Sequence, residues 1–200
     1  MVIGVTGKYC SGKNFITSIL EAREFAIADV DTIGHEVLDE KREETAKLFG
    51  IDVLLPNGHI NRKMLGEIVF ANRAKLKQLE DLLHPAMKER VASFVKKHAN
   101  SAINAALLYT MGLDMLCDAV ITVQAPLLQR IFRGMKRDHL SLFQVIRRIL
   151  AQRKIQVKNT EGEADRYIIS NSGDEAEMVI DATKSIASII ESLKQRKREP

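Results

Sequence analysis

A stretch of eight residues near the N-terminus has the residue types and the spacing of a phosphate-binding loop. Residues 7–14 read Gly-Lys-Tyr-Cys-Ser-Gly-Lys-Asn and match the pattern G-x-x-x-x-G-K-[ST] at every fixed position except the last. The glycines let the backbone curl until successive N–H groups point inward, and the following helix presents its positive end to the same place. Lys13 can then reach the β- and γ-phosphate oxygens, where negative charge is handled during transfer. The stretch predicts an ATP site with contacts from Lys8, Tyr9, Cys10, Ser11, Gly12, Lys13 and Asn14.

The last position of this pattern is the one that departs. A Ser or Thr hydroxyl there coordinates Mg²⁺, whereas Asn14 offers a neutral amide oxygen on a longer side chain. Two interpretations stay open: the amide of Asn14 is a metal ligand in place of the hydroxyl, or magnesium binding is weakened. Cys10 lies inside the loop, and we expect a small tolerated side chain with no catalytic role.

Two carboxylates follow the second apolar run of the chain. Asp29 and Asp31 come directly after residues 25–28, at the end of a predicted strand, where open parallel sheets place their functional side chains. Alternation along an extended chain turns both carboxylates to the same side, so one could hold hydrated Mg²⁺ while the other meets an acceptor hydroxyl. Asp29 is the predicted metal residue, together with Asn14. The alternative is that both aspartates are ordinary residues at the start of a helix.

The elements that must position these groups alternate along the chain. Short β-rich runs are separated by long helical patterns, and they occur at residues 2–6, 25–28, 102–108, 119–123 and 167–169. This alternation predicts an α/β fold of the P-loop NTPase type, with a five-stranded parallel sheet flanked by helices. We expect the nucleotide-binding core to comprise residues 1–30, 100–126 and 160–200.

Two segments interrupt that core. Residues 31–99 have helical patterns almost throughout, with an N-cap at Asn61 and a helix whose first turn holds Pro85, and we expect a helical insertion that forms one wall of a substrate cleft. Residues 127–159 are the predicted basic helical lid. Between positions 128 and 158 they carry nine Lys and Arg residues, with Asp138 as the only acid. That excess suits a cover over polyphosphate, and the alternative is a solvated helical face.

Composition limits the class of protein. Two hundred residues are enough for one hydrophobic core with smaller appended pieces. The net charge of +4 is small for a nucleic-acid binder, so we expect no nucleic-acid partner. The N-terminal apolar run is too short for a signal sequence, and no run approaches the roughly 20 apolar residues that span a bilayer. Cys10 and Cys117 make no disulfide framework. We therefore expect a cytoplasmic protein with no membrane partner, as a monomer or a weak homo-oligomer.

Motifs beyond the loop extend this interpretation. They stand, in order, at Ile3-Gly4-Val5-Thr6-Gly7, Asp29-Val30-Asp31, His35-Glu36-Val37, Asn57-Gly58-His59-Ile60-Asn61-Arg62, Leu65-Gly66-Glu67-Ile68-Val69-Phe70, Leu79-Glu80-Asp81-Leu82-Leu83-His84-Pro85, Arg133, Arg137-Asp138, Arg148, Gln152, Ala164-Asp165 and Asn171-Ser172-Gly173. With these motifs the chain resembles the dephospho-CoA kinase family from about residue 3 to residue 181. The resemblance implies a kinase that uses ATP and Mg²⁺ to phosphorylate the ribose 3′-hydroxyl of dephospho-CoA, the step that yields CoA and ADP.

The resemblance also implies roles for single residues. Asp31 would orient or deprotonate the attacking 3′-hydroxyl, and Arg137, which matches the lid arginine of the family, would stabilise charge on the transferring phosphoryl group. With Lys13, these are the predicted catalytic residues. Asn171 would lie near the adenine of ATP, as a further ATP contact alongside Arg137. Weaker candidates for the lid role are Arg133 and Arg148.

The expected dephospho-CoA contacts are Thr6, Asp31, Arg62 and His84. For His84 the sequence favours the alternative of a buried histidine that caps the start of a helix. A second departure from the family stands at Thr110, where the family usually has a glutamate. Two other functions therefore stay open: a P-loop kinase for another nucleoside or nucleotide, and a nucleotide-binding sensor with weakened catalysis.

Overall fold

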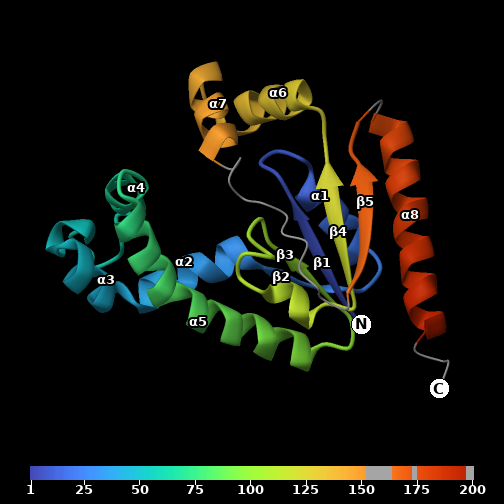
Figure 1. Ribbon diagram of the computed structural model, residues 1–200, viewed down its shortest axis with the longest axis horizontal. Coiled ribbons are helices and arrows are strands. Elements are labelled where there is room, and N and C mark those ends of the chain that lie inside the picture. The colour runs from blue at the N-terminus through green and yellow to red at the C-terminus, as the bar shows by residue number, and fades with distance from the viewer. Residues whose placement is uncertain (152–163, 173–174, 197–200) are drawn as a thin grey trace. The chain divides into compact units, whose positions relative to one another are not determined.

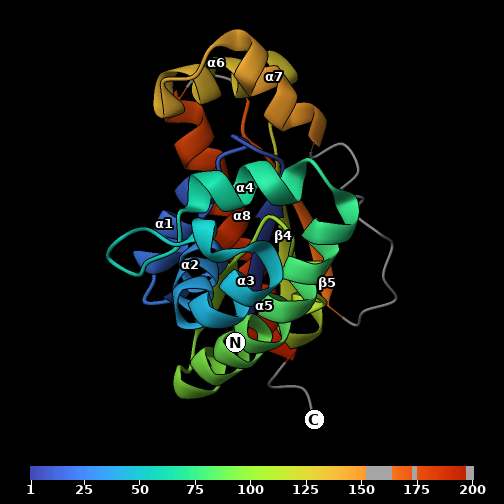
Figure 2. The ribbon, with the colours of Figure 1, turned by 90° about the vertical axis from the view of Figure 1, so that its left-hand side faces the viewer.

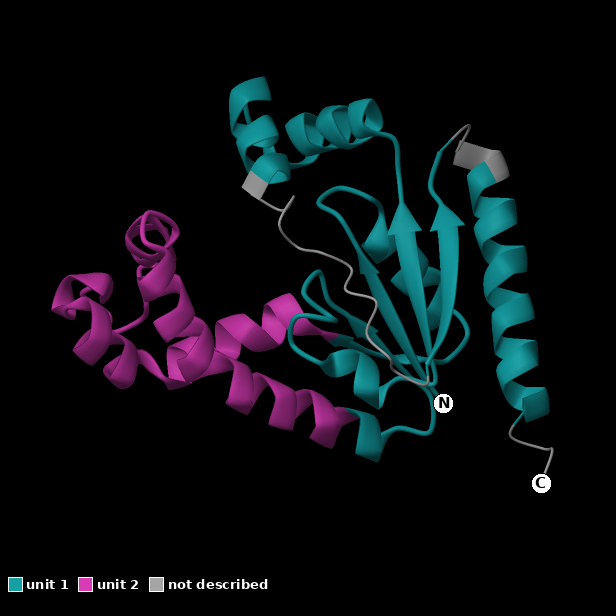
Figure 3. Ribbon diagram, in the orientation of Figure 1, with its two compact units in different colours: residues 1–28, 95–200 teal, residues 29–94 magenta. Residues whose placement is uncertain are grey.

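The chain forms two compact units in the computed structural model, which describes residues 1–151, 164–172 and 175–196. Unit 1 contains residues 1–28 and 95–200, and unit 2 contains residues 29–94 (Figure 3). The sequence placed the corresponding boundaries after residues 30 and 99. The last part of the predicted lid, residues 152–159, lies outside the described residues.

A five-stranded sheet organises unit 1. Its strands are β1 (Val2–Gly7), β2 (Ala26–Asp29), β3 (Ser101–Asn104), β4 (Ala119–Gln124) and β5 (Asp165–Ser170). They lie in the order β2-β3-β1-β4-β5, with β1 in the centre, and β1 pairs in parallel with β3 and β4. The parallel α/β sheet predicted from the sequence is confirmed.

One face of the sheet packs against two helices. In α1 (Lys13–Glu21), Ile16 and Leu20 stand four residues apart, so they share a helix face and are both fully buried. The long α8 (Glu175–Arg196) runs beside β5 (Figure 1) and adds Ile186 and Leu193 to the same core. Ile3 and Val5 of β1 belong to the same core and are fully buried.

The segment after β3 covers the opposite face of the sheet. The sequence predicted a strand from 102 to 108, but β3 ends at Asn104 and the prediction is wrong beyond it. The chain turns instead: Met111 N donates to Leu107 O over 2.9 Å and Leu113 N to Leu108 O over 2.9 Å. Leu108, Met111 and Leu113 are buried, because this apolar run folds back over the sheet.

Unit 2 is helical. Its elements are α2 (Val30–Glu40), α3 (Arg42–Phe49), the 3₁₀ turn η1 (Ile51–Val53), α4 (Arg62–Phe70) and most of α5 (Arg73–Lys97). Asn61 caps α4 as predicted, since its side chain accepts from Met64 N at 3.2 Å. Arg90 of α5 donates to Glu40 of α2 at 2.8 Å and to Glu36 at 3.1 Å, which ties these two helices together.

Pro85 corrects a second expectation. The sequence placed it in the first turn of a helix, but it stands inside α5, which begins twelve residues earlier at Arg73. An interior proline removes one backbone hydrogen bond and costs about 3 kcal/mol. Leu83, Met87 and Val91 repeat at helical spacing on both sides of it and are buried, and this packing keeps the helix continuous.

The lid segment of unit 1 forms α6 (Leu127–Asp138) and α7 (Leu142–Ala151), which lie side by side in Figure 1 and Figure 2. Helix α6 ends at His139, whose φ of 52° is left-handed. Ser141 and Gln144 then start α7 with a reciprocal capping box: Ser141 N donates to Gln144 Oε1 at 3.0 Å, and Gln144 N donates to Ser141 Oγ at 3.4 Å.

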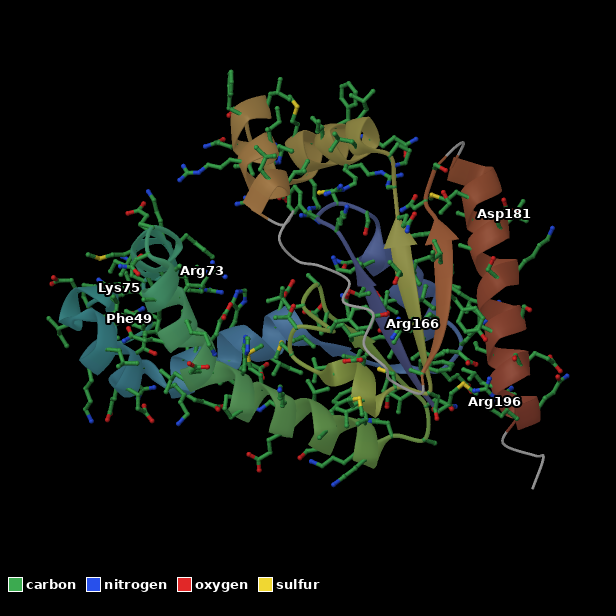
Figure 4. All side chains as sticks on the ribbon, viewed as in Figure 1. Phe49, Arg73, Lys75, Arg166, Asp181 and Arg196 are labelled. Carbon is green, nitrogen blue, oxygen red and sulfur yellow. The ribbon has the colours of Figure 1, made fainter. Side chains whose placement is uncertain are left out.

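Helix α8 ends at Arg196. Arg196, labelled at the end of α8 in Figure 4, pairs with Asp165 of β5 over 2.6 Å, and residues 197–200 lie outside the described residues. Within the described ranges, no helix is both long enough and apolar enough to cross a bilayer.

Candidate active site

The phosphate loop connects β1 to α1 in unit 1. Its backbone is tightly curled: Ser11 N donates to Lys8 O at 3.0 Å, and Cys10 takes a left-handed φ of 57°, which is uncommon outside glycine. Cys10 itself is buried, consistent with a small side chain that only has to fit. The curl presents the end of the loop to the N-terminus of α1, where the first helical residues are Lys13 and Asn14.

Gly12 is required at its position for two reasons. Its φ is 101°, and a Cβ there would stand 1.8 Å from Nδ2 of Asn171. This close approach lets Asn171, which follows β5, donate Nδ2–H to Ser11 O at 2.7 Å. On its other side Asn171 Oδ1 accepts from Arg133 of α6 at 2.9 Å. A chain of hydrogen bonds therefore runs from the lid helix through Asn171 into the phosphate loop.

Lys13 and Asn14 each have a defined partner. Lys13 Nζ donates to Gly7 O at 3.3 Å, so the ammonium is held across its own loop. Asn14 Oδ1 accepts from Nδ2 of Asn104 at 3.2 Å. Asn104 is the last residue of β3, the strand next to β1, where P-loop enzymes commonly carry the aspartate that helps to hold Mg²⁺. Both positions of this pair are neutral amides here.

Tyr9 of the loop is bound to the lid helix at both ends. Its backbone oxygen accepts from Arg130 Nε at 2.7 Å, and its hydroxyl donates to Asp138 Oδ2. Asp138 also accepts from Arg137 Nε at 2.7 Å and from Arg148 Nη1 at 3.0 Å. The two guanidinium groups lie over the Tyr9 ring, 5.4 Å and 5.8 Å from its centroid.

These contacts fix the protonation states of the cluster. The hydrogen bonds from Arg137 lower the pKa of Asp138 to about 2, while burial and then the bond to Asp138 raise the pKa of Tyr9 to about 12. The pKa of Arg137 is raised by the same carboxylate. At neutral pH the cluster therefore holds an anionic Asp138, a neutral Tyr9 and cationic arginines.

Buried donors around the loop point to an anion. Arg130 is only 6% exposed, and burial lowers the pKa of its guanidinium. Within the described part of the chain, Arg130 Nη2, Arg133 Nη1 and Ser11 Oγ are buried without a hydrogen-bond partner. Buried polar atoms are nearly always satisfied in folded proteins, and phosphate oxygens are acceptors that arginine binds well. The structure thus surrounds the loop with donors suited to a polyphosphate.

The predicted acceptor residues are divided between the units. Thr6 of β1 is buried in unit 1 and donates to Ala106 O at 3.4 Å. In unit 2, Asp31 is exposed in the first turn of α2, and Arg62 is exposed at the start of α4. Asp29 is the N-cap of α2, since its Oδ1 accepts from Thr32 N at 2.9 Å.

His84 belongs to the middle of α5, so the interpretation that it caps a helix start is wrong. It is partly buried, and that burial lowers the pKa of its imidazole. A neutral His84 at pH 7 can still donate or accept one hydrogen bond, as a substrate contact requires.

Three residues of this region were not assigned to the site from the sequence: Asn104, Arg130 and Asp138. The last two did carry a signal, because Arg130, Gly134 and Asp138 repeat every four residues and share one face of α6. Asn104 carried none, because its side chain bonds to Asn14 of α1, which is ninety residues away in the sequence.

A parallel sheet with a phosphate loop after its central strand, and a helical segment rich in arginine bound to that loop, defines a P-loop kinase. Comparison with known proteins identifies the family within this class of kinases. The family model for dephospho-CoA kinase matches residues 1–177, and the chain belongs to that family of ATP-dependent phosphotransferases.

Relatives and solved structures agree. A dephospho-CoA kinase of Bacillus licheniformis is 35% identical over 185 residues, covering 86% of this chain and 89% of the relative. One of Helicobacter pylori is 35% identical over 176 residues, covering 85% and 88%. The structure of a dephospho-CoA kinase from Campylobacter jejuni superposes with a TM-score of 0.67 at 29% identity, covering 94% and 96%. The Thermus thermophilus protein TT1252 gives a TM-score of 0.79 at 26% identity, with the same coverage.

Proposed function

We propose that this chain transfers the γ-phosphoryl group of ATP to the ribose 3′-hydroxyl of dephospho-CoA, with Lys13 and Arg137 acting on the phosphates and Asp31 on the acceptor. The observation that carries the proposal is the phosphate loop between β1 and α1, in a chain whose residues 1–177 match the family. The product is CoA, and the co-product is ADP.

The phosphate half of the proposed mechanism uses the loop, the N-terminus of α1, Lys13 and Arg137. The curled loop and the N-terminus of α1 supply backbone N–H groups to the β- and γ-phosphates. Lys13 exchanges its bond to Gly7 O for a phosphate oxygen, and Arg137 places a second charge where negative charge spreads in the transition state. Arg130 and Arg133 support the loop from α6 rather than reacting themselves.

Asn171 has a supporting role in this proposal. Its amide is already engaged at Ser11 O and by Arg133, so its side chain positions the loop. We therefore expect the backbone after β5, and not the Asn171 side chain, to lie near the adenine of ATP.

The acceptor half rests on Asp31. A carboxylate within hydrogen-bond reach of a hydroxyl orients it for in-line attack and can take its proton. Asp31 is suited to this because it is exposed, whereas Asp29 is engaged as the cap of α2. Thr6, Arg62 and His84 are the proposed contacts that bind dephospho-CoA.

Magnesium is part of the proposal. The oxygen donors of Asn14 and Asp29 suit a hard cation, and the bound ion would neutralise charge on the phosphates. The described residues contain no cluster of three or more His, Cys, Asp or Glu side chains that could hold a metal ion. The expected cytoplasmic location and the monomeric or weakly associated state belong to this proposal as well.

The direct test combines the purified protein with ATP, Mg²⁺ and dephospho-CoA and follows CoA by mass spectrometry. AMP, adenosine and shikimate serve as competing acceptors, because the phosphate loop alone does not select the acceptor. Formation of CoA at a kcat/KM well above that for the other acceptors is the expected result. Preference for another acceptor would make the chain a different P-loop kinase. ATP binding without transfer to any of them would favour the sensor.

A further inference from the structure

One face of α6 is built around Tyr9. The three residues Arg130, Gly134 and Asp138 stand four apart, so they form a line along the helix. Tyr9 lies lengthwise on that line. Arg130 Nε donates to its backbone oxygen at 2.7 Å, and its hydroxyl donates to Asp138 Oδ2 at the other end. Between them, a Cβ on Gly134 would stand 3.0 Å from Tyr9 Cε1 and 3.2 Å from Tyr9 Oη.

The same tyrosine supports the charges of the lid. Arg137 donates Nε to Asp138 Oδ1 at 2.7 Å and Nη2 to Asp138 Oδ2 at 3.2 Å. This bidentate pair uses one edge of the guanidinium, and Nη1 takes no part in it. The ring of Tyr9 lies beneath both Arg137 and Arg148. The carboxylate that orients the two arginines is therefore fixed to the phosphate loop by a loop residue.

We propose that Tyr9 is a positioning residue for phosphoryl transfer: its hydroxyl and ring hold Asp138 so that Arg137 stays beside the phosphate loop, and Gly134 is the lid residue that permits this approach. The inference rests on the proposed function for its chemical consequence. The geometric part, that Tyr9 fixes α6 on the loop, does not depend on which acceptor is phosphorylated.

Kinetics separate this role from general stability. Tyr9→Phe removes only the hydroxyl and keeps the ring, so Asp138 loses one of its three partners while the ring still supports the arginines. Because Arg137 acts mainly on the transition state, kcat should fall by about tenfold while the Kd for ATP changes less than about threefold. The matched control is Tyr167→Phe, which removes a hydroxyl bonded to Asp165 of β5 and should leave both constants unchanged.

Gly134→Ala tests the same contact from the lid side. Alanine is favoured over glycine in the interior of a helix, so the variant should fold. Its Cβ would stand 3.0 Å from both Tyr9 Cε1 and Val145 Cγ1, so each of these side chains must shift. We expect a fall in kcat that resembles that of Tyr9→Phe, and a smaller effect of Gly134→Ala when Tyr9→Leu has already removed the ring.

The closing experiment pairs these kinetics with hydrogen–deuterium exchange of residues 127–138 in wild type, Tyr9→Phe and Tyr167→Phe, with and without ATP. Faster exchange of α6 in Tyr9→Phe alone, together with the fall in kcat, supports the proposal. Unchanged exchange in α6, or unchanged kcat, overturns it. If wild type forms no CoA, the proposed function fails, and the exchange result by itself decides whether Tyr9 positions the lid helix.

Discussion

The phosphate loop of unit 1 and the helices of unit 2 hold their predicted functional residues in different ways. Around the loop, side chains far apart in sequence bond to each other: Asn171 reaches Ser11 across 160 positions and Tyr9 reaches Asp138 across 129. In unit 2, Asp31 and Arg62 are exposed at the starts of their own helices. The bonds that join helices there, from Arg90 to Glu36 and Glu40, lie on residues with no proposed catalytic role.

This difference separates preorganised groups from groups that the substrate must engage. Charges held by a network before ATP binds lose little freedom at the transition state, so their removal should lower kcat. Exposed side chains on single helices lose rotamer freedom when they engage dephospho-CoA. Substitution of most of them should therefore raise the KM for that substrate. Asp31 is the exception, because its proposed role is to act on the reacting hydroxyl. The following substitutions test where this division fails.

Lys13→Ala should have the largest effect. Its ammonium is held across the loop by Gly7 O, and its proposed role is to act on the phosphates in both the ground state and the transition state. We expect turnover to fall by about 10³-fold or more, with an unchanged circular dichroism spectrum and melting temperature. Near-normal turnover in the folded variant would remove the loop from the mechanism.

Asp31→Asn should be next. The amide is nearly isosteric but cannot take the proton of the hydroxyl, so transfer should fall by about 10²- to 10³-fold while ATP still binds. The matched control is Asp29→Asn, because asparagine caps a helix about as well as aspartate and should preserve the bond to Thr32 N. Single-turnover rates for both variants measure the ranking, and the reverse order would move the base to Asp29.

Arg137 should give a smaller loss, of about 10²-fold for Arg137→Ala, because Arg133 and Arg148 leave positive charge nearby. Arg137→Lys should not rescue it, since an ammonium cannot make the bidentate pair with Asp138 and also reach a phosphate. Steady-state kcat with saturating ATP is the measurement. Full activity of the lysine variant would reduce the role of this residue to general electrostatics.

The loop could be predicted from the sequence because its information is local. Gly7, Gly12 and Lys13 stand within seven positions, and a strand before them and a helix after them are required by the same pattern. The bonds that stabilise this loop were not predictable. Tyr9 occupies a position that the pattern leaves unspecified, and its partners Arg130 and Asp138 lie in the predicted lid, where the sequence did not single them out as loop contacts.

The errors in the fold have a related cause. Local chemistry suggested that a helix begins at Pro85 and that a strand continues to Leu108. In both places burial of neighbouring apolar residues outweighed the local signal: α5 stays continuous to bury Leu83 and Met87, and the chain after Asn104 turns to bury Leu108 over β1. Packing between distant segments decides such cases, and one sequence does not display it.

The smallest predicted effect concerns the neutral pair of Asn14 and Asn104. In many P-loop enzymes a hydroxyl at the first position and a carboxylate at the second hold Mg²⁺ and its waters. Here the amide oxygen of Asn14 accepts from Asn104 at 3.2 Å, so one lone pair of the only side-chain oxygen at position 14 is already used. The pair carries no negative charge, and we expect this protein to need more Mg²⁺ than a relative with the charged pair.

A double-mutant cycle tests that expectation. Asn14→Ser alone supplies a compact hydroxyl but breaks the bond to Asn104, and Asn104→Asp alone supplies a charge that faces the amide oxygen of Asn14 unless that amide turns over. Each single change should therefore leave the half-saturating Mg²⁺ concentration roughly unchanged. The double variant restores both partners and should lower it by about tenfold, a coupling of roughly 1 kcal/mol between the two sites. Mg²⁺ titrations of kcat, repeated by calorimetry with a non-hydrolysable ATP analogue, measure the cycle without relying on turnover alone. Strictly additive effects would show that the two amides act independently and that the phosphates, with Asp29 or Asp31, set the metal affinity instead.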